Sequence, residues 1–102
     1  RHAERAVTIA PWDPDSRLLR GRLYLGDGRL AEASADAETA MRWAPFRPGA
    51  RYLRSLTRQQ AGDLTGAWSD AVEASRLYPI DKDYRTRATG LGQAVAGRLP
   101  GE

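Results

Sequence analysis

The sequence predicts an all-α protein built as a stack of antiparallel helix hairpins. Three observations carry this prediction: residue types that recur at one constant interval, alanines spaced as on one helix face, and glycines and prolines where helices must end. At 102 residues the chain has the size of one small domain or of a few units of a repeat array. We therefore expect a single array over residues 1–102.

Prolines and alanines define the period. Pro11, Pro45 and Pro79 lie at intervals of 34, and an alanine precedes each of them by five residues and another by eight. These alanines are Ala3, Ala6, Ala37, Ala40, Ala71 and Ala74. Alanines three or four residues apart lie on one face of a helix, where their small size lets neighbouring helices approach closely.

The predicted helix ends follow from the same residues. Proline lacks an N–H and clashes with the preceding turn, so Pro45 ends one helix, whereas Pro48 suits the first turn of the next. Asp13 is a plausible N-cap, and Gly28 and Gly62 fall where a hairpin must turn. These signals predict helices at 1–10, 14–26, 29–44, 48–61, 64–78 and 83–97.

In units of the repeat, we expect a truncated second helix at 1–11, full repeats at 14–47 and 48–81, and a C-terminal capping helix at 82–99. Residues 1–10 match 35–44 and 69–78, so the chain is expected to begin inside an earlier unit of a longer array.

Composition excludes several classes of function. The chain has no cysteine, which excludes a disulfide framework, a thiol nucleophile and a cysteine-based metal site. The one histidine, His2, has no catalytic partners in the sequence, so we predict no enzymatic activity, no metal and no cofactor. No apolar run approaches the ~20 residues needed to span a bilayer. We expect a soluble segment of a larger protein, in the cytoplasm or outside it.

The unit resembles the tetratricopeptide repeat (TPR), which is about 34 residues long and has two helices and a W-x2-L-G-x2-Y … A-x3-F … A … P pattern. The matching positions are Gly21, Tyr24, Ala33, Ala37, Ala40 and Pro45 in the first full unit, and Ser55, Ala67, Ala71, Ala74 and Pro79 in the second. The resemblance implies a right-handed superhelical stack, a TPR-like α-solenoid.

The resemblance also implies a non-catalytic protein–protein interaction scaffold that binds a partner segment on the concave face formed by the first helices. The contact residues that it implies are Leu18, Arg22, Tyr52, Leu56 and Gln59. Family members that grip a C-terminal carboxylate use a set of lysines and asparagines. This chain has no asparagine, so we expect that clamp to be absent.

The first helices depart from the family pattern, because arginines stand where large apolar residues are usual. Of the 16 basic residues, only Lys82 is not arginine. The arginines at repeating positions are Arg17, Arg51 and Arg85, then Arg20 and Arg54 one turn later, then Arg58. In a stack they would align as a basic stripe. Either the first helices are rotated relative to the family standard, or their apolar side chains line the concave face.

The stripe leaves two interpretations open. It could bind an acidic peptide, an anionic glycan or a phosphate through charge-assisted hydrogen bonds. Alternatively it pairs with carboxylates of the chain itself, those at the helix starts and others nearby. The helix-start carboxylates are Asp13, Asp15, Asp81 and Asp83.

Other functions also stay open. The repeat ends in Ala-Pro followed by an aromatic residue, similar to arrays on bacterial membrane proteins that polymerise or ligate glycans. The chain could thus be a glycan-binding or regulatory appendage of such an enzyme, or a structural spacer. A net charge of +3 makes nucleic acid an unexpected partner, and self-association through the array ends is possible. The aromatic residues expected to pack between helices are Trp12, Trp43, Phe46, Trp68 and Tyr78.

Overall fold

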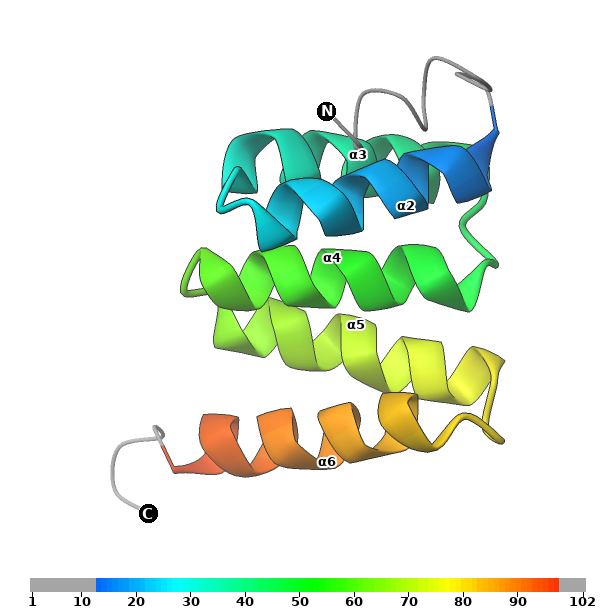
Figure 1. The fold of residues 1–102 in the computed structure, drawn as a ribbon. Helices are drawn as coiled ribbons and strands as arrows, with labels where there is room; N and C mark the ends of the chain where they lie inside the picture. The colour runs from blue at the N-terminus through cyan, green and yellow to red at the C-terminus, as the bar shows by residue number, and fades with distance from the viewer. Residues whose placement is uncertain (1–12, 98–102) are drawn as a thin grey trace.

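A computed structural model describes residues 13–97, which form α-helices joined by short turns (Figure 1). The helices are α2 (Pro14–Gly26), α3 (Leu30–Trp43), α4 (Pro48–Gln60), α5 (Leu64–Leu77) and α6 (Lys82–Ala96). No strand occurs in this part of the chain, and each helix matches its predicted range to within one residue at either end. The all-α fold class is confirmed. The helix predicted at 1–10 and the truncated unit at 1–11 lie outside the described residues.

The helix ends form through the predicted local chemistry. The Asp13 carboxylate accepts a hydrogen bond at 3.1 Å from a backbone N–H in the first turn of α2. Asp63 and Asp81 cap α5 and α6 in the same way. Gly28 and Gly62 have φ angles of 77° and 89°, a left-handed conformation that glycine adopts without steric cost. Both hairpins therefore turn at the predicted glycines.

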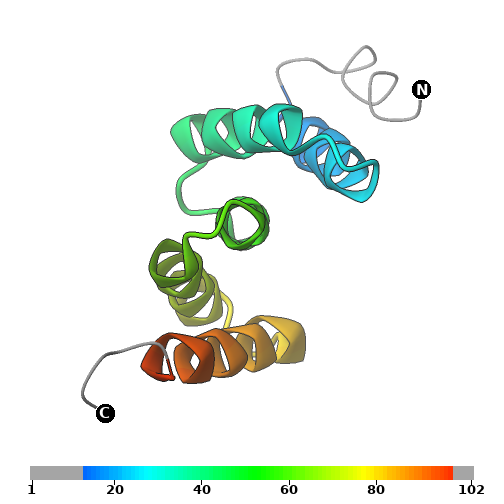
Figure 2. The same cartoon turned by 90° about the vertical axis from the view of Figure 1, so that its left-hand side faces the viewer.

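The helices stack as hairpins around one open side. α2 packs on α3, α4 on α5, and α6 on α5. Figure 2 shows α2, α4 and α6 bordering the open side of the stack, with α3 and α5 away from it. We call the open side the concave face. It is therefore formed by the first helix of each unit.

Alanines supply most of the core. The fully buried ones are Ala33, Ala37, Ala40, Ala50, Ala67, Ala71 and Ala74. Leu18 and Leu53 are the large side chains of the cluster between the first two hairpins, and Leu91 brings α6 onto α5. Because alanine adds little bulk, the helices of this core pack at close range.

Each hairpin also buries one carboxylate between its two helices. Asp36 in α3 and Asp70 in α5 occupy the same position in successive units, and both are 0% exposed. Arg20 donates two parallel hydrogen bonds to Asp36, at 2.8 and 2.6 Å. Arg54 does the same to Asp70, at 2.9 Å for both. The hydrogen bond to Asp70 raises the pKa of Arg54 above its usual value. Such bidentate pairs are among the strongest hydrogen-bonded contacts in proteins.

Further arginines complete these clusters. Arg17 reaches Asp36 at 3.4 Å. Arg51 and Arg58 each reach Asp70 at 3.2 Å. All of these arginines belong to the first helix of a hairpin, and both aspartates belong to the second helix. The ion clusters therefore hold the two helices of each hairpin together.

The linker aromatics do not pack between helices, contrary to the expectation from sequence. Phe46 is 82% exposed, and Ile80, at the equivalent place in the next linker, is 75% exposed. Trp43, Trp68 and Tyr78 are partly exposed, but each contacts a neighbouring helix. The Arg17 guanidinium of α2 lies 5.2 Å from the Trp43 ring centroid, Trp68 Nε1 would be 3.0 Å from a Cβ at Gly92 of α6, and the Tyr78 ring centroid lies 6.4 Å from that of Tyr84 in α6. The linker holds Phe46 at the surface, where it lines an open hollow together with Trp43, Pro45 and Pro48 instead of a helix–helix contact. The sealing role expected of Phe46 is wrong, and Trp12, its counterpart, lies outside the described residues.

Removing a buried carboxylate should destabilise the fold strongly. Asp70→Ala removes the interior counter-charge that Arg51, Arg54 and Arg58 share. The exposed carboxylates Glu38 and Asp63 remain near Arg54 and Arg58. Breaking a buried ion pair costs about 3–5 kcal/mol, and the partial exposure of the arginines places this case near ~3 kcal/mol. We expect the melting temperature, followed by circular dichroism, to fall by roughly 10 °C or more.

Glu38→Ala is the matched control. Glu38 accepts a hydrogen bond from Arg54 at 3.3 Å, but its own side chain is exposed. Exposed ion pairs contribute about 0–1 kcal/mol, so this variant should unfold close to the wild type. Equal losses in the two variants would contradict a structural role that depends on burial.

Gly21→Ala should destabilise the contact between α2 and α4. A Cβ at Gly21 would lie 2.5 Å from Cδ2 of Leu53, so either the buried Leu53 side chain or one of the helices has to shift. Overpacking of this kind costs about 1–3 kcal/mol. Gly26→Ala, in the same helix with open space around it, should instead stabilise the chain by up to ~1 kcal/mol. Urea unfolding measures both, and destabilisation by Gly26→Ala would count against the steric explanation.

Candidate partner-binding groove

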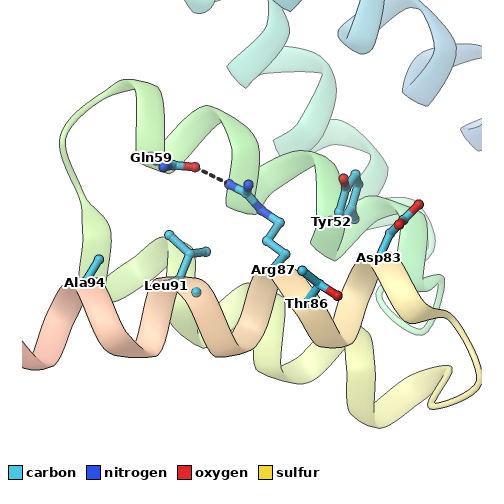
Figure 3. Close-up of a pocket in the computed structure, with 8 residues that line it drawn as sticks. Tyr52, Gln59, Asp83, Thr86, Arg87, Leu91 and Ala94 are labelled. Carbon is cyan, nitrogen blue, oxygen red and sulfur yellow. Dashed lines mark hydrogen bonds between the residues drawn. The ribbon is translucent and has the colours of Figure 1, made fainter.

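A groove lies between α4 and α6 on the concave face (Figure 3). Its volume is about 380 Å³, and it is open to solvent along one side. The residues that line it are Tyr52 and Gln59 from α4, and Asp83, Thr86, Arg87, Gly90, Leu91 and Ala94 from α6. The groove thus combines apolar, aromatic and charged side chains.

Small residues close the equivalent space between α2 and α4. Cα atoms of these two helices approach to within 8 Å. Leu53 of α4 packs against Gly21 of α2, which has no side chain in the way. In the same manner Gly49 of α4 leaves room for Leu18 of α2, whose Cδ1 would lie 3.3 Å from a Cβ added at Gly49. Leucine against glycine therefore lets α2 and α4 pack closely at this interface.

Larger polar residues take these four places at the next interface. One repeat later, Ser55 and Arg87 replace Gly21 and Leu53. In the same register, Tyr52 and Asp83 replace Leu18 and Gly49, and both line the groove. α4 and α6 meet through these side chains, and the space that remains between them is the groove.

The Arg87 guanidinium spans the groove floor. Its Nε donates to Ser55 Oγ at 3.0 Å, and its Nη2 donates to Gln59 Oε1 at 2.6 Å. It also lies 5.8 Å from the centroid of the Tyr52 ring, within cation–π range. The Tyr52 ring in turn packs against Tyr84, with centroids 5.0 Å apart. These contacts hold a cation and an aromatic surface side by side.

Burial and charge both act on the groove residues. Burial lowers the pKa of Arg87, but a guanidinium stays protonated throughout the physiological range. Burial also raises the pKa of the Tyr84 phenol, helped by Asp81, while the positive charge of Arg22 lowers it. Arg22 therefore lies close enough to α6 to contribute to the field on this face.

The five contact residues implied by the resemblance lie in different surroundings. Tyr52 and Gln59 line the groove. Arg22 is exposed on α2 and is not part of the groove lining. Leu56 is half-buried against the core, and Leu18 is only 6% exposed. Leu18 is therefore a core residue with little surface left for a partner.

The basic stripe is not a free cationic surface. Its members that contact Asp36 or Asp70 are Arg17, Arg20, Arg51, Arg54 and Arg58. The last member, Arg85, donates to the carbonyl of Pro79. The arginines face the second helix of their own hairpin, so the first helices are not rotated to present them to solvent. The partners are interior aspartates rather than the helix-start carboxylates, of which Asp15 pairs with Arg47 at 2.8 Å.

The contribution of α6 to the groove was missed in the sequence. Interpreted as a C-terminal capping helix, it offered only Arg85, a member of the basic stripe, as a candidate contact residue. The repeat register carried part of the signal, since Thr86, which lines the groove, stands one repeat after Tyr52. Arg87 could not be found by that rule, because its equivalent in the preceding unit is the core residue Leu53.

Two further searches bear on the kind of site. Within residues 13–97, His, Cys, Asp and Glu side chains form no group of three or more that could hold a metal ion. Across the same residues, no helix is long and apolar enough to cross a membrane.

Comparison with known proteins finds this fold in other chains. No protein-family model matches the sequence, and no curated protein matches it. Similar solved structures include the first TPR of Spaghetti (RPAP3) bound to the HSP90 peptide SRMEEVD, with a TM-score of 0.80 and 20% identity over 92% of this chain and 75% of that one. PcrH in complex with the chaperone binding region of PopD has a TM-score of 0.71 and 20% identity, over 94% and 74% of the two chains.

A third similar structure is that of the UNC-45 chaperone, from work on the features critical for its binding and folding of muscle myosin. It has a TM-score of 0.76 and 29% identity over 83% of this chain, which spans only 10% of the UNC-45 chain. These similarities agree with the repeat pattern and with the arrangement of α2 to α6. The chain has a tetratricopeptide-like helical-repeat fold.

Proposed function

We propose that this chain is a non-catalytic interaction module that binds a segment of a partner protein on its concave face, with the α4–α6 groove as the main contact. The observation that carries the proposal is the groove itself, where the ring of Tyr52 lies beside the cation of Arg87. Aromatic and arginine side chains are the residues most enriched at the energetic centres of protein interfaces.

The similar structures support this class of function. Two of them contain peptide segments, from HSP90 in one case and from PopD in the other. The groove follows α6 from Asp83 to Ala94, about three helical turns. An extended or helical segment of a partner matches that shape better than a compact small molecule, because the groove is shallow and open along its length.

The Arg87 guanidinium favours an acidic residue in the part of a partner segment that lies over it. Asp83, nearer the start of α6, lines the groove with the opposite charge. An anionic ligand held by the basic stripe is no longer the better alternative, because buried aspartates neutralise most of that stripe. The glycan-binding and spacer functions have no observation on the concave face that favours them over a peptide.

Filling the groove should abolish binding without harming the fold. Gly90 lines the groove and has open space around its Cα. Gly90→Leu should strengthen α6 by up to ~0.8 kcal/mol, because glycine is the poorer helix former, while its side chain occupies the groove. As probes we would use fluorescein-labelled dodecapeptides selected from a random display library on the wild-type chain. We expect their affinity, measured by fluorescence anisotropy, to fall about tenfold or more.

Ala96→Leu provides the control for added apolar bulk. Ala96 is exposed at the end of α6 and does not line the groove, so this variant should bind the selected peptides as the wild type does. Peptides that bind Gly90→Leu and wild type equally would show that binding takes place elsewhere and would refute the groove as the site.

A further inference from the structure

Arg87 differs from the other arginines of the first helices in the partners it has. Arg20 and Arg54 each donate two hydrogen bonds to a buried carboxylate. The hydrogen bonds of Arg87 end on neutral oxygens, the hydroxyl of Ser55 and the amide of Gln59. Within residues 13–97, no carboxylate forms an ion pair with it. The groove therefore contains a positive charge that the described part of the chain leaves uncompensated.

The guanidinium also has donors to spare. Of its five N–H groups, one on Nε and one on Nη2 are engaged, and Nη1 has no hydrogen-bond partner among the described residues. The two engaged acceptors differ in how firmly they are held. Ser55 is fully buried and donates to the carbonyl of Ala67 at 2.7 Å, whereas Gln59 is exposed. Gln59 can move aside for a stronger acceptor, while Ser55 keeps Nε in place.

The repeat register shows that the charge replaces an apolar contact. Leu53 seats against Gly21 at the first interface, and Arg87 meets Ser55 at the next. The equivalent Leu53 packs against α2 without needing a polar acceptor. The arginine is instead partly desolvated, which lowers its pKa. A charge in such a place becomes stabilising when a carboxylate from outside supplies the counter-charge.

The position of Arg87 along α6 indicates which carboxylate it would meet. Residues that line the groove extend from it in both directions, to Asp83 toward the start of α6 and to Ala94 toward its end. A segment that follows the groove therefore passes over Arg87 and continues on either side. Its acidic group is then a side chain within the segment rather than the carboxylate at a chain end.

From these observations we propose that Arg87 anchors an aspartate or glutamate side chain of the partner segment. The carboxylate accepts hydrogen bonds from Nη1 and Nη2 and displaces Gln59, and a neighbouring apolar side chain of the segment packs on Tyr52 and Leu91. This inference rests on the proposed peptide-binding function and specifies the chemistry of the peptide.

A charge-deletion cycle tests the anchor. The probes are the selected dodecapeptides that lose affinity for Gly90→Leu, each compared with a copy in which its acidic residue is changed to the amide. On wild type the amide copy should bind about tenfold more weakly, because a hydrogen bond to a charged group is lost. On Arg87→Gln the acidic and amide copies should bind alike. Arg87→Lys, which keeps the charge but not the planar fork, should recover only part of the difference.

Arg85→Gln is the matched control. It removes the same charge from the same helix, two residues away, but Arg85 donates to the Pro79 carbonyl and does not line the groove. It should keep nearly the full preference for the acidic copy. Equal effects of Arg85→Gln and Arg87→Gln would reduce the preference to net charge and overturn the anchor.

Other outcomes separate this inference from the proposed function. Groove-dependent peptides without any acidic residue would refute the anchor and leave peptide binding intact. A preference carried by the peptide's terminal carboxylate, and lost on C-terminal amidation, would refute the side-chain assignment. A selection without a single groove-dependent peptide would refute the proposed function, and the anchor with it. The comparison of peptide copies on wild type is independent of how well any variant folds.

Discussion

The burial of Asp36 and Asp70 is the constraint on which the rest of the structure depends. A carboxylate without solvent requires a counter-charge and acceptable hydrogen-bond geometry. Within residues 13–97, the first helix of the same hairpin supplies both. Arg20 and Arg54 do so with bidentate contacts. The alanine faces alone would permit neighbouring registers between two helices, because alanine side chains are small and alike. The bidentate contact between the carboxylate and its arginine is made in one register only. Buried ionic groups confer structural specificity in this way in several proteins.

This use of arginine determines which surface is available for binding. Because the repeating arginines face inward, they contribute to hairpin geometry and little to the surface charge of the concave face. The character of that face is then set by positions that change from one unit to the next. Leu18 and Gly49 close the first interface, and Tyr52 and Asp83 open the second. Positions with the same residue in both repeats maintain the stack, and positions that differ between the repeats shape the groove.

The fold could be predicted from the sequence because it rests on local and periodic signals. Glycines with positive φ, capping aspartates and prolines act within a few residues, so their spacing alone located the ends of α2 to α6. The exposure of Phe46 could not be predicted in this way. Its burial depends on how closely two hairpins approach, and no local pattern states that distance.

The site was predicted less completely than the fold, for a physical reason. Equivalence between repeats places Tyr52 and Gln59 on the concave face, but it treats position 87 as a copy of the buried Leu53. The difference arises from a pair of residues: a side chain at Ser55 fills the space that Gly21 leaves for leucine, and the same hydroxyl gives an arginine an acceptor. Each substitution alone is unfavourable, since leucine would crowd the serine and arginine over glycine would lack its acceptor. Ser55 and Arg87 both differ from the residues one repeat earlier, Gly21 and Leu53, and they are hydrogen-bonded to each other across 32 residues of sequence. This pair marks the place where a helix-stacking contact is replaced by a polar groove.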